Sequence, residues 1–196
     1  MVPLLNIHTH TPLHDGEQTI PAYGLHPWLV DADWKERMAD VERDVAAHRG
    51  GSFMLGECGL DKLYRATYEW QLEAMQAHIQ LSERLGVPMI VHCVKAFDDL
   101  LRLHRQAAQP WIIHGFRGNP QQLAQLLSHS LYVSFGYKYN RDSLLACPLD
   151  RMFLESDDTA LPIAPLYEQV AGAKGISMEQ LATRILSTTA ALPLSV

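Results

Sequence analysis

The chain has 196 residues, a hydrophobic content of 47% and a formal net charge of −6. This length fits a single domain over residues 1–196, and the apolar content is ample for a sizeable core. The negative charge argues against a basic surface that coats nucleic acid. It leaves open an enzyme that holds phosphate locally with metals and a few cations.

The sequence also indicates a compartment. Residues 1–5 have no basic flank and too short an apolar run for a signal peptide, and no stretch is long and apolar enough to span a membrane. Cys58, Cys93 and Cys147 form no CxxC pair and are odd in number. A disulfide framework or thiolate zinc site is therefore disfavoured, and a reducing, cytoplasmic location is expected.

The first predicted strand, residues 3–8, runs into His8-Thr9-His10. Because side chains alternate across a strand, His8 and His10 point to one side, and Ile7 and Thr9 point to the other. Two adjacent imidazoles pack poorly in a core but serve well as a pair of metal ligands. A polar strand end exposed to water is the alternative that this pair alone leaves open.

Further strands and helices follow from the alternation of short apolar runs with longer amphipathic stretches. The further strands are expected at about 21–25, 52–57, 88–92, 110–114, 131–135 and 151–155. Helices are expected at 32–48, 65–85 and 96–108, after Asn119-Pro120, after Asn140, and after the capping box of Ser177 and Gln180. This alternation indicates an α/β protein with a parallel sheet, either open or closed into a barrel.

Histidines or carboxylates stand at the carboxyl ends of six of these seven strands. They are His8 and His10, His26, Glu57 and Asp61, His92, His114, and Glu155 and Asp157. In a β/α barrel these ends converge on the face where active sites are built, whereas in an open sheet they are spread along a line. Convergence favours a TIM-type (β/α) barrel built on these parallel strands. Four imidazoles and two carboxylates drawn from this set would suit two divalent ions, with one carboxylate bridging them.

Cations follow the same strand ends, namely Lys62, Lys95, Arg117 and Lys138. In a barrel these cations lie on the same face as the candidate ligands, although the protein as a whole is acidic. They therefore indicate an anionic substrate, with phosphate as the commonest candidate. Ordinary surface charge is the alternative for each of them taken singly. The histidines away from strand ends are expected in solvated or capping roles, and they are His14, His48, His78, His104 and His129.

Between residue 6 and about residue 160 the chain carries, in order, HTH, GLHP, GECGLD, Gln71, PMIVHC, IIHGFRG and PLDRMFLESD. As a set, these pieces resemble the TatD family of metal-dependent hydrolases, within the amidohydrolase-like group of barrels. The resemblance implies a two-metal hydrolase similar to nucleases that act on DNA phosphodiesters, some of them 3′–5′ exonucleases.

The resemblance also implies a role for individual residues. The ligands would be His8, His10 and Asp157 for one ion, His92 and His114 for the second, and Glu57 as the bridge. Asp157 would also orient or deprotonate the attacking water. His26 would contact phosphate or support the ligands.

The chain departs from the family pattern at several points. Asn6 stands where the family usually has Asp, Val94 where it has Arg, and Arg117 where it has Ser. The segment between HTH and GLHP is also too short to hold the usual extra helix and strand. We therefore expect a reduced TIM-type (β/α) barrel of about seven main parallel strands, with a short ordered segment at 16–20. The shorter segment removes part of the barrel wall. It is therefore expected to alter the family's DNA-binding groove more than the positions of the metal ligands.

The favoured function is hydrolysis of a phosphodiester by metal-activated water, as in a TatD-type deoxyribonuclease. Arg117 or Lys95 would stabilise the transition-state charge, and Lys62 is a further candidate for binding substrate. Hydrolysis of a C–N or C–O bond and a non-catalytic metal-binding barrel remain as alternatives. The sequence leaves open whether the metal is zinc, manganese or magnesium, and whether the phosphoester substrate is DNA, RNA or smaller. It also leaves open the oligomeric state.

Overall fold

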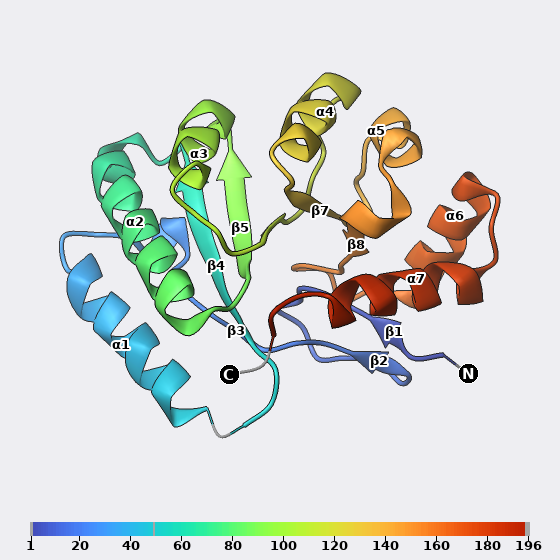
Figure 1. Ribbon diagram of the computed structural model, residues 1–196, viewed down its shortest axis with the longest axis horizontal. Helices are drawn as coiled ribbons and strands as arrows, with labels where there is room; N and C mark the ends of the chain where they lie inside the picture. Colours follow the sequence, from blue (N-terminus) through green and yellow to red (C-terminus); the bar gives the residue numbers. More distant parts are fainter. Residues whose placement is uncertain (1, 49, 195–196) are drawn as a thin grey trace. The chain divides into compact units, whose positions relative to one another are not determined.

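The computed structural model describes residues 2–48 and 50–194, with helices and strands that alternate along the chain (Figure 1). The chain divides into two compact units: the first comprises Met1–Ile20 and Ile113–Leu192, and the second Pro21–Ile112 and Pro193–Val196. Strand β6 (Trp111–Ile113) spans the division in the sequence. Within the described ranges, every helix is too short or too polar to cross a membrane.

The second unit is built on parallel strands that pair in the order β3 (Ala22–Tyr23), β4 (Met54–Asp61) and β5 (Met89–Val94). Helix α2 (Tyr68–Leu85) packs against β4, and α1 (Trp34–Ala47) lies beside α2 (Figure 1). The remaining elements are η1 (Pro27–Leu29), η2 (Arg65–Thr67) and α3 (Phe97–His104). Every residue of β4 is buried, which is typical of a parallel strand covered on both faces.

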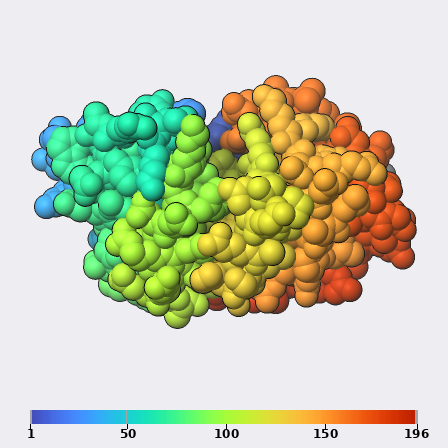
Figure 2. Space-filling model, turned by 90° about the horizontal axis from the view of Figure 1, so that it is seen from above, coloured from blue at the N-terminus to red at the C-terminus, as the bar shows by residue number. Residues whose placement is uncertain are grey.

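In the first unit, two pairs of parallel strands form: β1 (Leu4–Leu5) with β2 (Glu17–Gln18), and β7 (Tyr132–Phe135) with β8 (Met152–Leu154). Its helices are α4 (Pro120–Ser128), α5 (Arg141–Ala146), η3 (Leu149–Arg151), α6 (Ala164–Lys174) and α7 (Met178–Ala190). Helices α6 and α7 pack side by side (Figure 1). Helices α4, in yellow, and α5, in orange, adjoin on the face that Figure 2 shows.

The seven predicted strands are all present, but the first and second, now β1 and β3, are each only two residues long and shorter than expected. Regular pairing in β1 ends at Leu5, because the backbone beyond it turns to the end of β8: the Ile7 N–H donates to the Leu154 carbonyl (3.0 Å). An eighth strand, β2, occupies the segment expected to be ordered at 16–20. The predicted caps at Asn119, Asn140 and Ser177 are confirmed, whereas helix α6 was not predicted.

A glycine in β4 allows that strand to approach β5 closely. Gly59 has a φ of 147°, and a Cβ at this position would lie 2.0 Å from the His92 carbonyl oxygen. The register between the two strands also shifts between Leu55 and Cys58. Glu57 lies within this irregularity, and irregularities of this kind commonly change the direction of a side chain. The backbone of the second unit thereby sets where Glu57 and His92 stand.

His78 contradicts the expectation of a solvated or capping histidine. It is fully buried in α2, where its Nε2 accepts from the Leu25 N–H (3.0 Å) and its Nδ1 donates to the Ala74 carbonyl (2.8 Å). Both ring nitrogens are therefore satisfied by backbone groups, so a neutral imidazole can replace an apolar residue in the core. Through Leu25, His78 also fixes the backbone just before His26.

We expect His78 to make the fold less stable in mild acid. Burial lowers its pKa from 6.5 to about 4, so the unfolded chain binds the proton more readily between these two values. The stabilisation is complete above pH 6.5 and is lost as the pH falls toward 4. Relative to His78→Gln, the wild-type free energy of unfolding should drop by about 3 kcal/mol between pH 7 and pH 4.

Urea denaturation of both proteins in EDTA at the two pH values measures this change. The glutamine variant keeps an acceptor for the Leu25 N–H but does not titrate. A stability difference between the two proteins that is the same at both pH values would contradict the expectation.

Candidate functional site

The first unit brings together four of the predicted metal ligands. Ligand atoms of His8, His114 and Asp157 all lie within 4.8 Å of one another. The ring centroids of His8 and His10 are 4.7 Å apart, and those of His8 and His114 are 5.0 Å apart. His10 Nε2 lies 4.0 Å from Asp157 Oδ1. We call these four residues the first cluster.

Backbone hydrogen bonds hold Asp157 beside the HTH motif. The Asp157 N–H donates to the His8 carbonyl (3.2 Å), and the His10 N–H donates to the Asp157 carbonyl (2.9 Å). Asp157 has a φ of 55°, a left-handed conformation that residues other than glycine rarely adopt. Such conformations persist where the surrounding structure enforces them, and they are concentrated at functional sites.

The amide of Asn6 ties the same two segments together. Asn6 is buried, its Nδ2 donates to Ser156 Oγ (2.8 Å), and its Oδ1 accepts from the Ser156 N–H (3.0 Å). Ser156 Oγ in turn donates to Thr9 Oγ1 (3.0 Å). An ionised carboxylate could accept from the backbone but could not donate to Ser156. The departure from the usual Asp at position 6 therefore fits this network.

Glu155 belongs to the first cluster's surroundings but was not predicted as a site residue. It is fully buried, accepts from Ser134 Oγ, and has Oε1 3.3 Å from His114 Nδ1. Burial raises the pKa of this carboxyl group, but His114, His8 and the Ser134 hydroxyl outweigh it and leave the pKa lowered. A carboxylate at one ring nitrogen fixes the orientation of a ligating histidine. The position of Glu155 at the end of a predicted strand was the sequence signal that could have identified it as a site residue.

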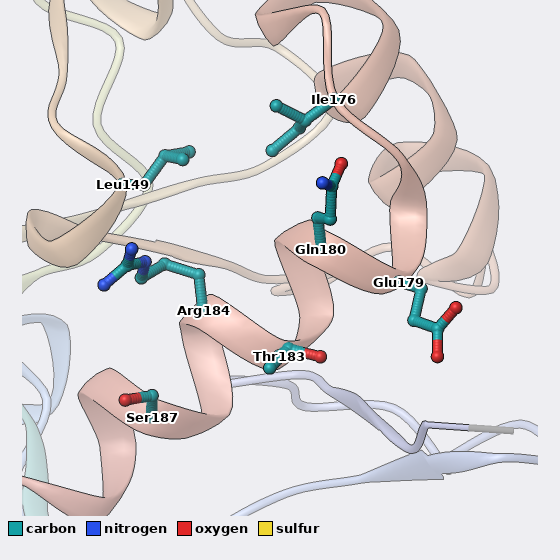
Figure 3. Close-up of a pocket in the computed structure, with 7 residues that line it drawn as sticks. All are labelled: Leu149, Ile176, Glu179, Gln180, Thr183, Arg184 and Ser187. Carbon is teal, nitrogen blue, oxygen red and sulfur yellow. The ribbon is translucent and has the colours of Figure 1, made fainter.

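A pocket of about 170 Å³ adjoins Asp157 within the first unit, and Arg117 and Lys138 are in its lining. Two of the predicted cations therefore lie at the same pocket as a predicted ligand. A larger pocket of about 630 Å³ runs along α7, where Leu149 and Arg184 are among the residues drawn (Figure 3). The lining of this larger pocket includes none of the predicted site residues.

The second unit holds another group of ligand atoms, from His26, Glu57 and His92, all within 4.8 Å of one another. Glu57 Oε1 lies 2.8 Å from His26 Nε2 and 2.7 Å from His92 Nδ1. His26 Nδ1 accepts from the Trp28 N–H (3.1 Å), so in the neutral ring Nε2 carries the proton and faces Glu57. We call His26, Glu57 and His92 the second cluster. His26 therefore lies directly against a predicted ligand.

Asp61 borders the second cluster and was not predicted as a site residue either. It is 2% exposed, its Oδ2 accepts from Trp28 Nε1 (2.8 Å), and the same oxygen lies 3.5 Å from His92 Nε2. Its Oδ1 accepts from the Leu63 N–H (2.9 Å). Asp61 thus fixes an aromatic side chain next to the cluster.

The cations of the second unit differ in their surroundings. Lys62 Nζ lies 2.8 Å from Asp99 Oδ2 and 5.5 Å from the centroid of the Tyr68 ring. Hydrogen bonds from Lys62 and then Tyr68 lower the pKa of Asp99 to about 2. Lys62 therefore has a carboxylate partner with which a phosphate would compete. Lys95 is exposed immediately after β5.

Each cluster forms within one unit. The first cluster contains four of the six predicted ligands, and the second contains the other two, Glu57 and His92. The assignment of Glu57 as a bridge between two ions stays a prediction from the resemblance, as do the substrate contacts of His26, Lys62, Lys95 and Arg117.

Comparisons with known proteins agree with the motifs. The family model for TatD related DNase matches residues 9–191. The chain is 28% identical to the uncharacterized metal-dependent hydrolase YcfH of Escherichia coli K12, over 90% of this chain and 74% of that protein. It is 29% identical to the 3′-5′ ssDNA/RNA exonuclease TatD of Pantoea vagans, over 83% of this chain and 73% of that protein.

Solved structures confirm the predicted fold class. A TatD family hydrolase from Entamoeba histolytica superposes with a TM-score of 0.71 at 16% identity, over 89% of this chain and 74% of that one. The TatD homologue YJJV of Escherichia coli superposes with a TM-score of 0.67 at 20% identity, over 90% of this chain and 76% of that one. Because the family model covers most of the sequence, the chain belongs to the family of TatD related DNases.

Proposed function

We propose that this chain is a divalent-metal-dependent phosphodiesterase whose substrate is nucleic acid. The observation that carries the proposal is the pocket of the first unit, which joins Asp157 of the first cluster to Arg117 and Lys138. Carboxylate and imidazole ligands suit a divalent ion, and cations beside it suit an anionic substrate. The relatives named 3′-5′ ssDNA/RNA exonuclease support single-stranded nucleic acid as that substrate.

The donor atoms of both clusters fit metal ions. The first cluster offers imidazoles and one carboxylate, and the second offers two imidazoles with Glu57. Such mixed nitrogen and oxygen sets suit zinc or manganese better than magnesium, which prefers oxygen. We propose one ion at each cluster. The resemblance pairs His114 with His92, whereas the geometry of the first unit supports a place for His114 beside His8 and Asp157.

Bound ions of this kind make water more acidic and draw charge from a phosphate group. The protein side chains supply the remaining functions. The Asp157 side chain is 24% exposed at the pocket, where its carboxylate can orient the attacking water and accept its proton. Arg117 and Lys138 bind phosphate oxygens and offset the charge that grows in the transition state. Glu155 holds the ring of His114.

We further propose that the protein works in the cytoplasm, where thiols stay reduced. Cys58 and Cys147 are buried, and all three cysteines are free thiols. Burial raises the pKa of Cys93 and of Cys147 to about 12, so neither is a reactive thiolate near neutral pH.

Asp157→Ala should abolish metal-dependent cleavage of a chromogenic phosphodiester and of end-labelled single-stranded DNA, with a loss of 10²-fold or more, because general base catalysis alone contributes about this much. Steady-state rates with zinc, manganese and magnesium measure it. Glu168→Ala, an exposed carboxylate on α6, is the matched control and should keep full activity.

Undiminished turnover in Asp157→Ala would show this site assignment to be wrong. A wild-type protein that binds metal but cleaves carboxylic esters or amides instead of phosphodiesters would refute the proposed substrate class.

Metal stoichiometry should separate the two clusters. Equilibrium dialysis followed by elemental analysis is expected to give two ions per wild-type chain, and one each for His8→Ala and His92→Ala, because each substitution removes a ligand from a different cluster. His129→Ala, at the exposed end of α4, is the control. If either cluster variant still binds two ions, or the wild-type chain binds only one, the two-site proposal is incorrect.

Glu155→Gln should weaken metal binding without removing a ligand. Loss of the carboxylate that orients His114 is expected to lower metal affinity about 10- to 100-fold. Titration of the metal-free protein measures this affinity, and Glu168→Gln serves as the surface control. An unchanged affinity in the folded variant would show that Glu155 does not position His114.

A further inference from the structure

Two aromatic side chains of the second unit stack on each other while both remain exposed. The rings of Trp28 and Tyr64 have centroids 5.5 Å apart and planes inclined by 23°. Trp28 is 54% exposed and Tyr64 is 44% exposed. The intervening chain also exposes Leu63, at 62%. We call Trp28 and Tyr64 the aromatic platform.

The platform is held in place by buried groups. The Trp28 Nε1–H donates to Asp61 Oδ2 (2.8 Å), and Asp61 is 2% exposed. The Asp61 N–H donates in turn to Oε1 of the fully buried Gln71 (2.8 Å). Scattered exposed aromatics are ordinary on protein surfaces. Here, however, the ring is fixed by a hydrogen bond from its nitrogen to a buried carboxylate, while more than half of the Trp28 side chain stays exposed beside Tyr64. Such fixation reduces the entropy cost of binding.

The platform also adjoins the second cluster. The Trp28 ring meets the His26 ring edge-on with centroids 4.8 Å apart, and the His92 ring with centroids 5.9 Å apart. A group stacked on the platform would therefore lie beside residues that we propose to hold a metal at the scissile phosphate. Within a nucleotide, the group next to a phosphate that has an aromatic face is the base.

We propose that the aromatic platform stacks a nucleobase of single-stranded nucleic acid next to the cleavage site. The inference rests on the proposed function and assigns residues to substrate binding. The net charge of −6 does not support binding by a broad basic surface. Stacking on an aromatic ring needs no such surface and accepts any base. A base inside a duplex has both faces covered, so the platform selects single strands.

The test measures binding apart from cleavage. Fluorescence anisotropy in EDTA compares a labelled ten-residue oligothymidylate with an abasic strand of the same number of phosphates. The wild-type chain should bind the thymidylate ~10-fold more tightly, within the range expected for one stacked base. Tyr64→Leu should remove most of this preference, and Tyr64→Phe, which keeps the ring, should retain it. Trp28→Leu is a second variant with the same expected loss.

Equal binding of both strands by the wild-type chain, or a preference that survives in Tyr64→Leu, would overturn the platform. Self-association of the wild-type chain that Tyr64→Leu abolishes would instead assign the surface to a second copy. Cleavage without a base preference leaves the phosphodiesterase standing and refutes the platform. A base preference without cleavage by the metal-loaded protein supports base stacking on the platform and refutes the phosphodiesterase.

Discussion

The pairing of residues 8–10 with Asp157 is the constraint on which the first cluster depends. Two backbone hydrogen bonds join segments nearly 150 residues apart and impose a left-handed conformation on Asp157. Because these bonds use backbone atoms of residues 8–10 and Asp157 alone, they do not depend on the length of the segment that follows the HTH motif. The short segment that follows the HTH motif is therefore compatible with the grouping of the predicted ligands His8, His10, His114 and Asp157. Strand β2 lies in this short segment, and Glu17 joins it to the N-cap residue of α6 by accepting from the Ile163 N–H (2.7 Å).

Buried polar groups position the predicted ligands in both units. Asn6, Glu155, Asp61 and His78 are almost fully buried, and each has hydrogen-bond partners that would be costly to leave unpaired. These residues contribute orientation, since each fixes a ligand, a neighbour of a ligand or an adjacent aromatic ring. Their energetic role is therefore asymmetric: removing one partner costs more than the bond contributes when formed.

The sequence predicts the features that local rules control. Alternating apolar runs located all seven main strands, and side-chain caps located the starts of α4, α5 and α7. Histidines and carboxylates at strand ends identified residues that the structure groups into two clusters. The failures share a cause. The burial of His78, the end of β1 at Leu5 and the role of Glu155 all depend on partners far away in the sequence. No local pattern reports such a partner.

The close approach of β4 and β5 at Gly59 limits how this chain can be redesigned. A side chain there would collide with the backbone of His92, so the spacing of the two strands that carry Glu57 and His92 depends on this glycine. At the metal site that we propose for the second cluster, substitution of Glu57 or His92 would change the donor atoms, whereas the spacing of the two strands would stay the same. Redesign of this proposed site is therefore confined to the choice of donor atoms as long as β4 and β5 keep their close approach at Gly59.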